Sequence, residues 1–421
     1  MKPVTAILIG AGDRGKDALA SYALKHPEEI KFVAVAEPDD KKREQFINAH
    51  DIPEEMAFTT WEDLLAKPKL ADAALICTLD NIHYEPAKLA LEKDYHILLE
   101  KPLSNNVKEC VLLGELAKKY SHKVFSVCHV LRFTKFFSKL KELLDSKVIG
   151  DIVTINHNEY VGRIHQSHSF VRGNWGNSKR ESPMILQKCC HDMDILLWLV
   201  GNNCKKISSF GSLDYFKEKS APEGSPDCCI EGCPAGDTCP YNAVKIYLGD
   251  NVEWPTSVIS ADTSYEARKK ALEEGPYGRC VFKCDNDVVD HQVVNMIFDN
   301  NVTAHLTMTA FCKDGGRHIK IMGTHGEITG DFDYDKIEIR HFPSEEIETI
   351  NIEKDAGGHG GGDLGIMEDF VKLVEADGKL KGKTEASISV QSHVMAFAAE
   401  ESRLTDKVIT IDEFTQQVLK S

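Results

Sequence analysis

The chain has 421 residues, 42% of them hydrophobic and 28% charged, which is typical of a soluble globular protein with about two or three domains. Its formal net charge of -16 at pH 7 argues against nucleic acid or an anionic membrane surface as the main partner, because both favour basic patches. No apolar run reaches the roughly 18 residues that span a bilayer, and an odd number of cysteines, 13, favours reduced thiols in the cytoplasm.

Short apolar runs alternate with helical segments through the first third of the chain. The predicted strands cover residues 4–9, 31–37, 72–77, 95–100 and 123–128. The predicted helices between them include 16–26, 85–93 and 108–120. This α/β alternation predicts a doubly wound parallel sheet of the Rossmann type. We expect it to form a first domain over 1–126, followed by a substrate-binding and oligomerisation domain over 127–421.

A glycine pattern, Gly10-Ala11-Gly12-Asp13-Arg14-Gly15, lies between the first strand and its helix. Gly10 allows a tight turn, Gly12 lets the backbone approach a pyrophosphate, and Gly15 permits close packing of the helix on the strand. The helix N-terminus would supply amide groups for the phosphates. The segment therefore predicts a dinucleotide site, with Asp13 and Arg14 beside the cofactor.

An acidic residue, Glu37, ends the second predicted strand, 22 residues after Gly15. A carboxylate at this offset binds the ribose diol and would repel a 2′-phosphate. NAD is therefore predicted as the cofactor, with NADP less favoured. Lys41, Lys42 and Arg43 lie close enough in the sequence to keep the NADP alternative open.

The second half of the chain changes character, because its apolar residues partly alternate with polar ones. The alternating runs cover 151–161, 288–298, 302–311, 317–323 and 336–342. They predict a C-terminal α/β domain with a large open, mostly antiparallel sheet, covered on one face. Its open face would suit a homodimer or homotetramer. An amphipathic helix at about 388–403 could pack back on the first domain.

Five ordered motifs make the chain resemble the Gfo/Idh/MocA family, which includes glucose–fructose oxidoreductase and inositol dehydrogenase relatives. The motifs are IGAGDRG, ICTLDNIHYEPAKLAL, EKPLSNN, VLRF and HDMDILLWLVG, which lie in this order from Ile9 to Gly201. The resemblance implies a nucleotide-binding domain, a large open sheet, and oxidation of a carbinol on a sugar, polyol or glycoside by nicotinamide. It further implies residues that line the cofactor: Thr78, Leu79, Asn81 and His83, with Glu100 and Lys101 near the nicotinamide.

Oxidation of an alcohol removes a hydride and a proton, so the site needs a proton acceptor and a cation for the developing alkoxide. Lys101 follows a predicted strand at the edge where ligands bind in parallel sheets, and it could fill both roles. The resemblance adds His191 as the group that shares the hydroxyl proton. Relatives usually carry Asp four residues before that histidine, whereas this chain has Gln187.

The stretch QKCCHDMD, residues 187–194, collects cysteines, a histidine and aspartates. On one helix Gln187, His191 and Asp194 would share a face, while the two cysteines would point elsewhere. This pattern indicates proton handling and not a metal site. Because Gln cannot accept a proton, His191 would depend on Lys101 or Asp194, or would only orient the substrate.

Two further segments carry polar side chains suited to a carbohydrate. The glycine-rich loop 357–363 contains His359, and the stretch 163–175 is rich in hydrogen-bond donors. The predicted substrate-binding residues are Arg132, Arg163, His165, Trp175, Gln187, His191 and His359.

Six cysteines, between Cys228 and Cys284, gather in a Gly- and Pro-rich insertion. Their spacing is looser than the CxxC pairs of zinc knuckles, so a structural zinc, reduced thiols and a disulfide all stay open. In every case the insertion could shape the substrate entrance.

The sequence thus predicts an NAD-dependent dehydrogenase of a sugar, polyol or glycoside. One alternative is an enzyme that keeps NAD bound and cleaves a glycoside through transient oxidation and elimination. A binding or regulatory protein without turnover is a further alternative.

Overall fold

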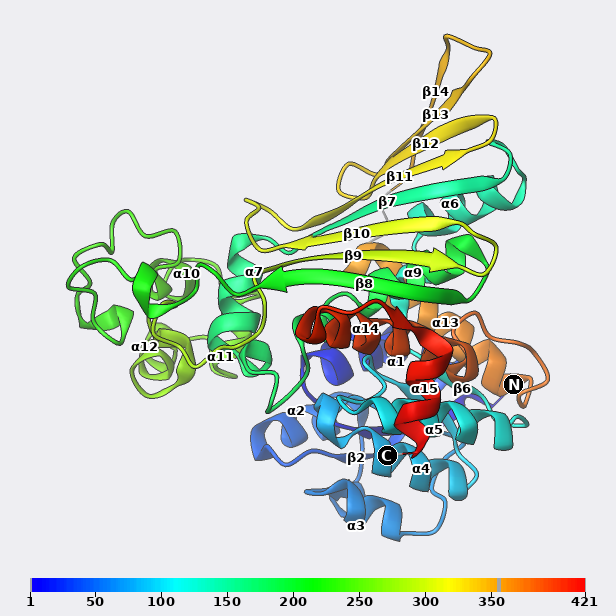
Figure 1. Cartoon of the computed structure of the whole chain (residues 1–421). Helices are drawn as coiled ribbons and strands as arrows, with labels where there is room; N and C mark the ends of the chain where they lie inside the picture. The colour runs from blue at the N-terminus through cyan, green and yellow to red at the C-terminus, as the bar shows by residue number, and fades with distance from the viewer. Residues whose placement is uncertain (1, 354–356, 421) are drawn as a thin grey trace.

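Two sheets organise the chain, one in each lobe of the molecule (Figure 1). They are seen in a computed structural model that describes residues 2–353 and 357–420. The first sheet belongs to the N-terminal part of the chain and the second to the remainder.

The first sheet has six strands in the order β3-β2-β1-β4-β5-β6, all parallel. Its strands are β1 Val4–Ile9, β2 Ile30–Ala36, β3 Ala57–Phe58, β4 Ala73–Ile76, β5 His96–Leu99 and β6 Phe125–Val127. Its helices are α1 Ser21–Lys25, α2 Asp40–His50, α3 Trp61–Ala66, α4 Tyr84–Glu92 and α5 Val107–Lys119. Every residue of β4 and β5 is buried, as expected for parallel strands covered on both faces. The predicted Rossmann fold is confirmed.

The turn after β1 is shaped by two glycines. Gly10 has a φ of +92°, and a Cβ on it would lie 2.6 Å from the carbonyl oxygen of Cys77. A Cβ on Gly15 would lie 2.1 Å from the carbonyl oxygen of Gly10. The helical segment that follows begins as a π-helix at Asp13–Ala20 and continues as α1. The glycines therefore allow this segment to pack directly against the turn.

The second sheet has nine strands in the order β14-β13-β12-β11-β7-β10-β9-β8-β15. All neighbours are antiparallel except β7 and β10. Its strands are β7 Ile152–Tyr160, β8 Cys204–Ser212, β9 His291–Phe298, β10 Thr303–Thr309, β11 Gly316–Gly323, β12 Gly326–Asp331, β13 Lys336–His341, β14 Ile347–Asn351 and β15 Ile409–Thr410. The large, mostly antiparallel sheet is therefore confirmed.

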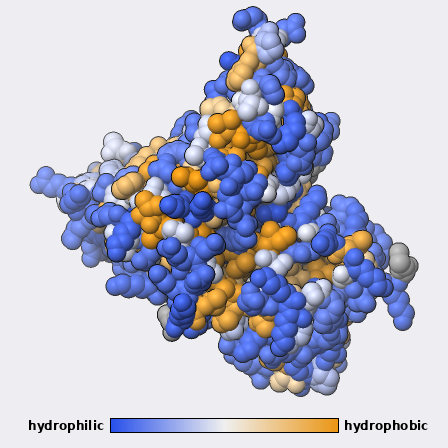
Figure 2. Space-filling model, turned by 45° about the vertical axis from the view of Figure 1, so that its right-hand side comes forward, coloured by the Kyte–Doolittle hydropathy of each residue, from blue (hydrophilic) through white to orange (hydrophobic). Residues whose placement is uncertain are grey.

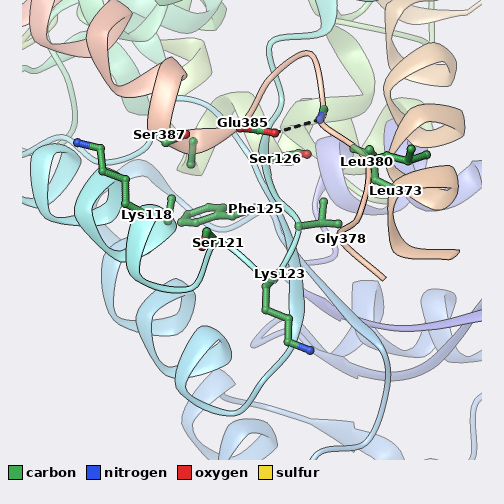
Figure 3. Close-up of a pocket in the computed structure, with 14 residues that line it drawn as sticks. Lys118, Ser121, Lys123, Phe125, Ser126, Leu373, Gly378, Leu380, Glu385 and Ser387 are labelled. Carbon is green, nitrogen blue, oxygen red and sulfur yellow. Dashed lines mark hydrogen bonds between the residues drawn. The ribbon is translucent and has the colours of Figure 1, made fainter. Parts of the chain in front are cut away.

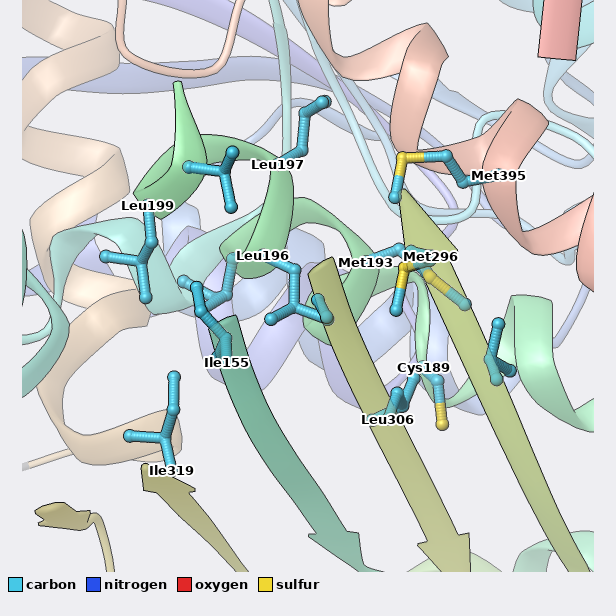
Figure 4. Close-up of a cluster of buried hydrophobic side chains, with 14 of the residues drawn as sticks. Ile155, Cys189, Met193, Leu196, Leu197, Leu199, Met296, Leu306, Ile319 and Met395 are labelled. Atoms are coloured by element: carbon cyan, nitrogen blue, oxygen red, sulfur yellow. The ribbon is translucent and has the colours of Figure 1, made fainter. Parts of the chain in front are cut away.

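One face of this sheet is covered by helices α6 Lys135–Asp145 and α9 Cys190–Val200. Figure 4 shows the packing, in which Leu196 of α9 lies against strand residues such as Ile155 and Leu306. Burial alternates residue by residue along β10 and β11, so only one side of each strand enters this core.

The opposite face of the second sheet carries exposed apolar side chains, including Phe210, which is 59% exposed, and Ile297, which is 42% exposed. On the face drawn in Figure 2, apolar side chains gather in patches among a largely hydrophilic surface. An oligomer interface on the open sheet face stays a prediction.

The last third of the chain returns to the first lobe. Helix α13, Gly362–Glu375, packs on β1, and α14, Ala386–Thr405, packs on α5 as well as on β8 and α9. His393 of α14 accepts a hydrogen bond at Nε2 from the backbone N–H of Leu103, at 3.0 Å. The expected boundary after residue 126 falls within β6, and the C-terminal helices contact both lobes.

An insertion between β8 and β9, residues 213–290, projects to one side of the second sheet (Figure 1). It contains α10 Ala243–Tyr247, α11 Thr256–Ile259 and α12 Tyr265–Glu274, with one small apolar cluster of its own and a second that it shares with Val171 and Ala310. Across the described residues, no helix combines the length and apolar character that crossing a bilayer requires.

The two glycines Gly15 and Gly12 give a matched stability test. Gly15→Ala should lower the free energy of unfolding by about 1–3 kcal/mol, because its Cβ would meet backbone that cannot yield. Gly12→Ala should change it by less than about 0.5 kcal/mol, since no heavy atom lies within 4 Å of the added Cβ. Urea denaturation of both variants measures the difference, and equal losses would contradict the packing described for Gly15.

Candidate active site

A cavity of about 870 Å³ lies where the carboxyl ends of β4 and β5 meet the second lobe. Ten of the predicted site residues line it, and they come from both lobes. These residues are Asp13, Arg14, Thr78, Glu100, Lys101, His165, Trp175, Gln187, His191 and His359.

Lys101 and His191 enter this cavity from different lobes. Lys101 follows β5, and its Nζ donates a hydrogen bond to the backbone carbonyl oxygen of Gln187, at 2.8 Å. His191 belongs to α9, is 5% exposed, and leaves its Nδ1 without a hydrogen-bond partner. A lysine and an imidazole from different lobes therefore share one cavity wall.

Burial lowers the pKa of His191 well below its usual value, and the positive charge of Lys101 lowers that pKa further. The ring of His359 lies nearby, with centroids 5.8 Å apart. The imidazole of His191 is therefore neutral near pH 7 and can accept a proton.

A chain of charged groups joins three segments that are far apart in the sequence. Arg14 Nε donates to Glu100 Oε1 at 2.7 Å, and Arg14 Nη2 donates to Asp363 Oδ1 at 2.9 Å. His359 Nδ1 donates to the other oxygen of Asp363, at 3.1 Å. Burial would raise the pKa of Asp363, but the hydrogen bond from His359 and the charge of Arg14 outweigh it and hold that pKa below its usual value.

The stretch 187–194 is not one continuous helix. This corrects the expectation that Gln187, His191 and Asp194 share one helix face. Helix α8 ends at Gln187, its range being Met184–Gln187, and α9 begins at Cys190. Gln187 still lines the cavity, but Asp194 does not join His191. Both oxygens of Asp194 accept hydrogen bonds from Arg132, at 2.7 Å each.

That pairing also places Arg132 outside the cavity, in contrast to the substrate-binding role expected for it. Arg132 is 4% exposed and further donates to the backbone oxygen of Lys383, at 2.8 Å. Arg163 does not line the cavity either, and it donates to the backbone oxygen of Pro240 at 2.8 Å. Both arginines therefore hold chain segments together.

A second buried ionic cluster lies behind the cavity wall. Arg317 donates to Asp192 at 2.8 Å and pairs with Glu159 at 2.7 Å. Lys188 pairs with Glu159 at 3.3 Å and lies 3.5 Å from His165 Nδ1. Lys188 and Arg317 both line the cavity, so these carboxylates set the position of two cations there.

The glycine turn reaches the cavity through Asp13 and Arg14, whereas Gly10, Gly12, Gly15 and Glu37 are not among the residues that line it. Glu37 accepts hydrogen bonds from the backbone N–H groups of Ala11, at 2.7 Å, and Asp39, at 3.0 Å. Arg43 pairs with Asp40 and donates to the backbone oxygen of Glu37. The carboxylate of Glu37 is therefore fixed beside the turn. Arg43 already has an anionic partner.

The expected cofactor residues after β4 differ in their surroundings. Thr78 lines the cavity, whereas Leu79 is 39% exposed and Asn81 is exposed outside the cavity wall. His83 is buried, with Nδ1 2.7 Å from the backbone oxygen of Pro102 and Nε2 3.1 Å from that of Thr78. His83 therefore links the Thr78 loop to the loop that carries Lys101.

Several cavity residues were missed by the sequence reasoning. Asp363 is the last residue of the glycine-rich loop 357–363 that was singled out, so its position offered a clue. Lys188 lies in the stretch 187–194 that was singled out, whereas Arg317 belongs to no motif. The insertion contributes Trp254 and Tyr277, and the ring of Trp254 lies edge-on to that of His165, with centroids 5.2 Å apart. Only the expectation that the insertion shapes the entrance pointed to these aromatic residues.

A second cavity, of about 310 Å³, lies at the N-terminal end of β6 (Figure 3). Lys118, Lys123 and Glu385 are among its 14 lining residues, and none of the predicted site residues is. Ligands of open α/β sheets bind at the carboxyl ends of strands, so the position of this cavity does not favour a catalytic site.

The expectation of a structural zinc is not supported. Among the described residues, His26, Glu28 and Glu29 are the one group of three or more potential ligands with ligand atoms within 4.8 Å of one another, and this group is at least partly exposed. All 13 cysteines are free thiols, so the disulfide alternative is not supported either.

Comparison with known proteins adds to this geometry. The Gfo/Idh/MocA family model described as an oxidoreductase family with an NAD-binding Rossmann fold matches residues 4–129. The model of the C-terminal alpha/beta domain of the same family matches residues 141–409.

Individual relatives share low sequence identity with this chain. The YteT protein of Bacillus subtilis, described as an oxidoreductase without a stated substrate, is 25% identical over 73% of this chain and 74% of its own. Inositol 2-dehydrogenase of Corynebacterium glutamicum is 27% identical over 48% of this chain and 55% of its own. A levoglucosan dehydrogenase solved with NADH and L-sorbose is 17% identical, covers 98% of this chain and 99% of its own, and superposes with a TM-score of 0.72.

The two matched models cover both lobes, and the lobes meet at a cavity lined by Glu100 and Lys101 of the EKP motif and by His191 of the HDMD motif. The chain is therefore an oxidoreductase of the Gfo/Idh/MocA family, with an NAD-binding Rossmann domain and a C-terminal alpha/beta domain.

Proposed function

We propose that the protein is an NAD-dependent dehydrogenase that oxidises a carbinol on a sugar, polyol or glycoside. The observation that carries this proposal is the shared cavity of Lys101 and His191, one on each lobe. When bound, the nicotinamide accepts the hydride. The ammonium of Lys101 stabilises the developing alkoxide, and the neutral imidazole of His191 takes up the hydroxyl proton.

The residues around the glycine turn fit a dinucleotide. No heavy atom lies within 4 Å of a Cβ built on Gly12, so this backbone is open to a pyrophosphate. Glu37 has both carboxylate oxygens fixed by backbone amides beside the turn and is suited to a ribose diol. The proposed surface for the dinucleotide also includes Gly10, Gly15, Asp13, Arg14 and Thr78.

A polyhydroxylated substrate suits the remaining wall of the cavity. Hydrogen-bonding and aromatic groups line this wall, and they belong to Lys188, His165, Trp175 and Trp254. The names of the relatives, inositol and levoglucosan dehydrogenase, agree with this class of substrate. Gln187 stands where relatives usually carry an aspartate, which could accept a proton. Its backbone oxygen accepts a hydrogen bond from Nζ of Lys101.

NADH formation is the test of the proposal. Purified protein incubated with NAD and a panel of sugars and polyols should form NADH in proportion to the substrate oxidised. Glycoside cleavage without net NADH would overturn the dehydrogenase assignment and support the elimination alternative.

Cofactor preference follows from the carboxylate of Glu37. NAD should bind more tightly than NADP in calorimetry, since the carboxylate would repel a 2′-phosphate. Glu37→Ser should narrow that difference. Equal affinities in the unaltered protein would contradict the role of Glu37 and direct attention to Lys41 and Lys42.

Lys101→Ala should lower kcat about a hundred-fold to ten-thousand-fold, because it removes the cation that stabilises the alkoxide. NAD affinity should persist, since the proposed phosphate and ribose contacts lie at the glycine turn. Lys118→Ala, on an exposed face of α5, is the control and should leave kcat unchanged. Near-normal turnover by Lys101→Ala would refute the assignment.

The pH profile of oxidation tests His191. Because its pKa is lowered, the base should already be deprotonated above about pH 6.5, so its acidic limb in kcat/KM should lie below that value. His191→Asn should lower kcat/KM and remove the limb. A limb centred above about 6.5, or one that persists in the variant, would exclude His191 as the base.

A further inference from the structure

The insertion between β8 and β9 gathers four of its six cysteines around one small cavity. Its wall includes Cys229, Cys233, Cys239 and Cys280, together with Arg172. Arg172 Nη2 lies 3.7 Å from the sulfur of Cys229. Four thiols that converge on one space next to a guanidinium form a potential metal site.

Backbone pairing brings the two cysteine-bearing segments together. Cys228 and Arg279 form an antiparallel bridge, and the N–H of Cys280 donates to the backbone oxygen of Asp227 at 2.7 Å. Gly232, with a φ of +89°, turns the chain between Cys229 and Cys233. The convergence of the thiols therefore follows from the fold of the insertion and not from chance contact of side chains.

The other two cysteines of the insertion are arranged differently. The sulfur of Cys228 lies 3.2 Å from the backbone oxygen of Gly278, and that of Cys284 lies 3.3 Å from the backbone oxygen of Cys280. Neither cysteine lines the cavity. They are therefore matched controls within the same insertion.

Arg172 supplies an independent observation. It is 1% exposed, its Nε and Nη2 donate to backbone oxygens at 2.7 Å, and its Nη1 has no hydrogen-bond partner. Within residues 2–353 and 357–420, no carboxylate forms an ion pair with it. Burying a charge without a counter-ion is costly, and neutral thiols do not offset it. Metal-bound thiolates would supply the missing negative charge.

The separation of the sulfur atoms distinguishes two occupants. Zn–S bonds of about 2.3 Å would bring four thiolates to roughly 3.8 Å from one another. No three of these cysteines have sulfur atoms within 4.8 Å of one another. In a [4Fe–4S] cluster each thiolate binds a different iron, so the sulfur ligands lie further apart. The sulfur atoms are therefore too far apart for a tetrahedral zinc site, and their separation does not conflict with a cluster.

We propose that Cys229, Cys233, Cys239 and Cys280 bind a [4Fe–4S] cluster whose negative charge is balanced by Arg172. Its role is structural. The insertion has one small apolar cluster of its own and shares a second with Val171 and Ala310, and a metal link would stabilise so small a core. The same insertion carries Trp254 and Tyr277 to the large cavity, so the cluster holds part of that wall in place.

The test is metal analysis of the full-length protein purified without oxygen. It should contain about four iron and four acid-labile sulfide per chain, with the visible absorption of an iron–sulfur cluster. Cys233→Ser and Cys239→Ser should lose most of the iron, whereas Cys228→Ser and Cys284→Ser should retain it.

NAD binding checks that the nucleotide-binding lobe of each variant is folded, while Cys228→Ser and Cys284→Ser show whether a serine in the insertion by itself causes loss of iron. Iron retained in Cys233→Ser and Cys239→Ser would overturn the ligand assignment. One zinc per chain without sulfide would overturn the cluster, and protein that contains neither metal would overturn the site. These measurements do not depend on turnover, so they succeed or fail separately from the dehydrogenase proposal.

Discussion

Arg14 binds two carboxylates from distant parts of the chain, Glu100 and Asp363, and the arrangement of the cavity depends on this pairing. Arg14 belongs to the glycine turn, Glu100 precedes Lys101, and Asp363 lies at the start of α13 and holds His359. Both carboxylates are buried, so loss of the arginine would leave them uncompensated. One side chain thus fixes the nucleotide turn, the lysine loop and the C-terminal segment relative to one another.

The same need to compensate buried charge explains the rest of the wall. Asp192 and Glu159 are paired with Arg317, and Asp194 is paired with Arg132. The aspartates near His191 in the sequence are therefore already engaged, and burial, together with the charge of Lys101, lowers the pKa of its imidazole. An unprotonated imidazole suits a proton acceptor, and Lys101 is the proposed cation at the reacting centre.

Local patterns predicted most of the framework. The apolar runs matched β1, β2, β4, β5 and β6 to within a few residues, and the alternating runs matched β7, β9, β10, β11 and β13. Strand β3 was missed because it has two residues, and β14 because it is an exposed edge strand without an apolar stripe. The break after Gln187 was missed because its helical periodicity continues across the kink, and only backbone hydrogen bonding reveals it.

The sequence by itself determined the dinucleotide turn and the two kinds of sheet, because spacing within one segment encodes each of these features. Tertiary structure alone decided which charges meet. Arg132 became the partner of Asp194, Asp363 became the partner of Arg14, and four of the insertion's cysteines came to share one cavity. Such contacts join residues far apart in the chain, and the free energy of a buried charge depends on its neighbours in space.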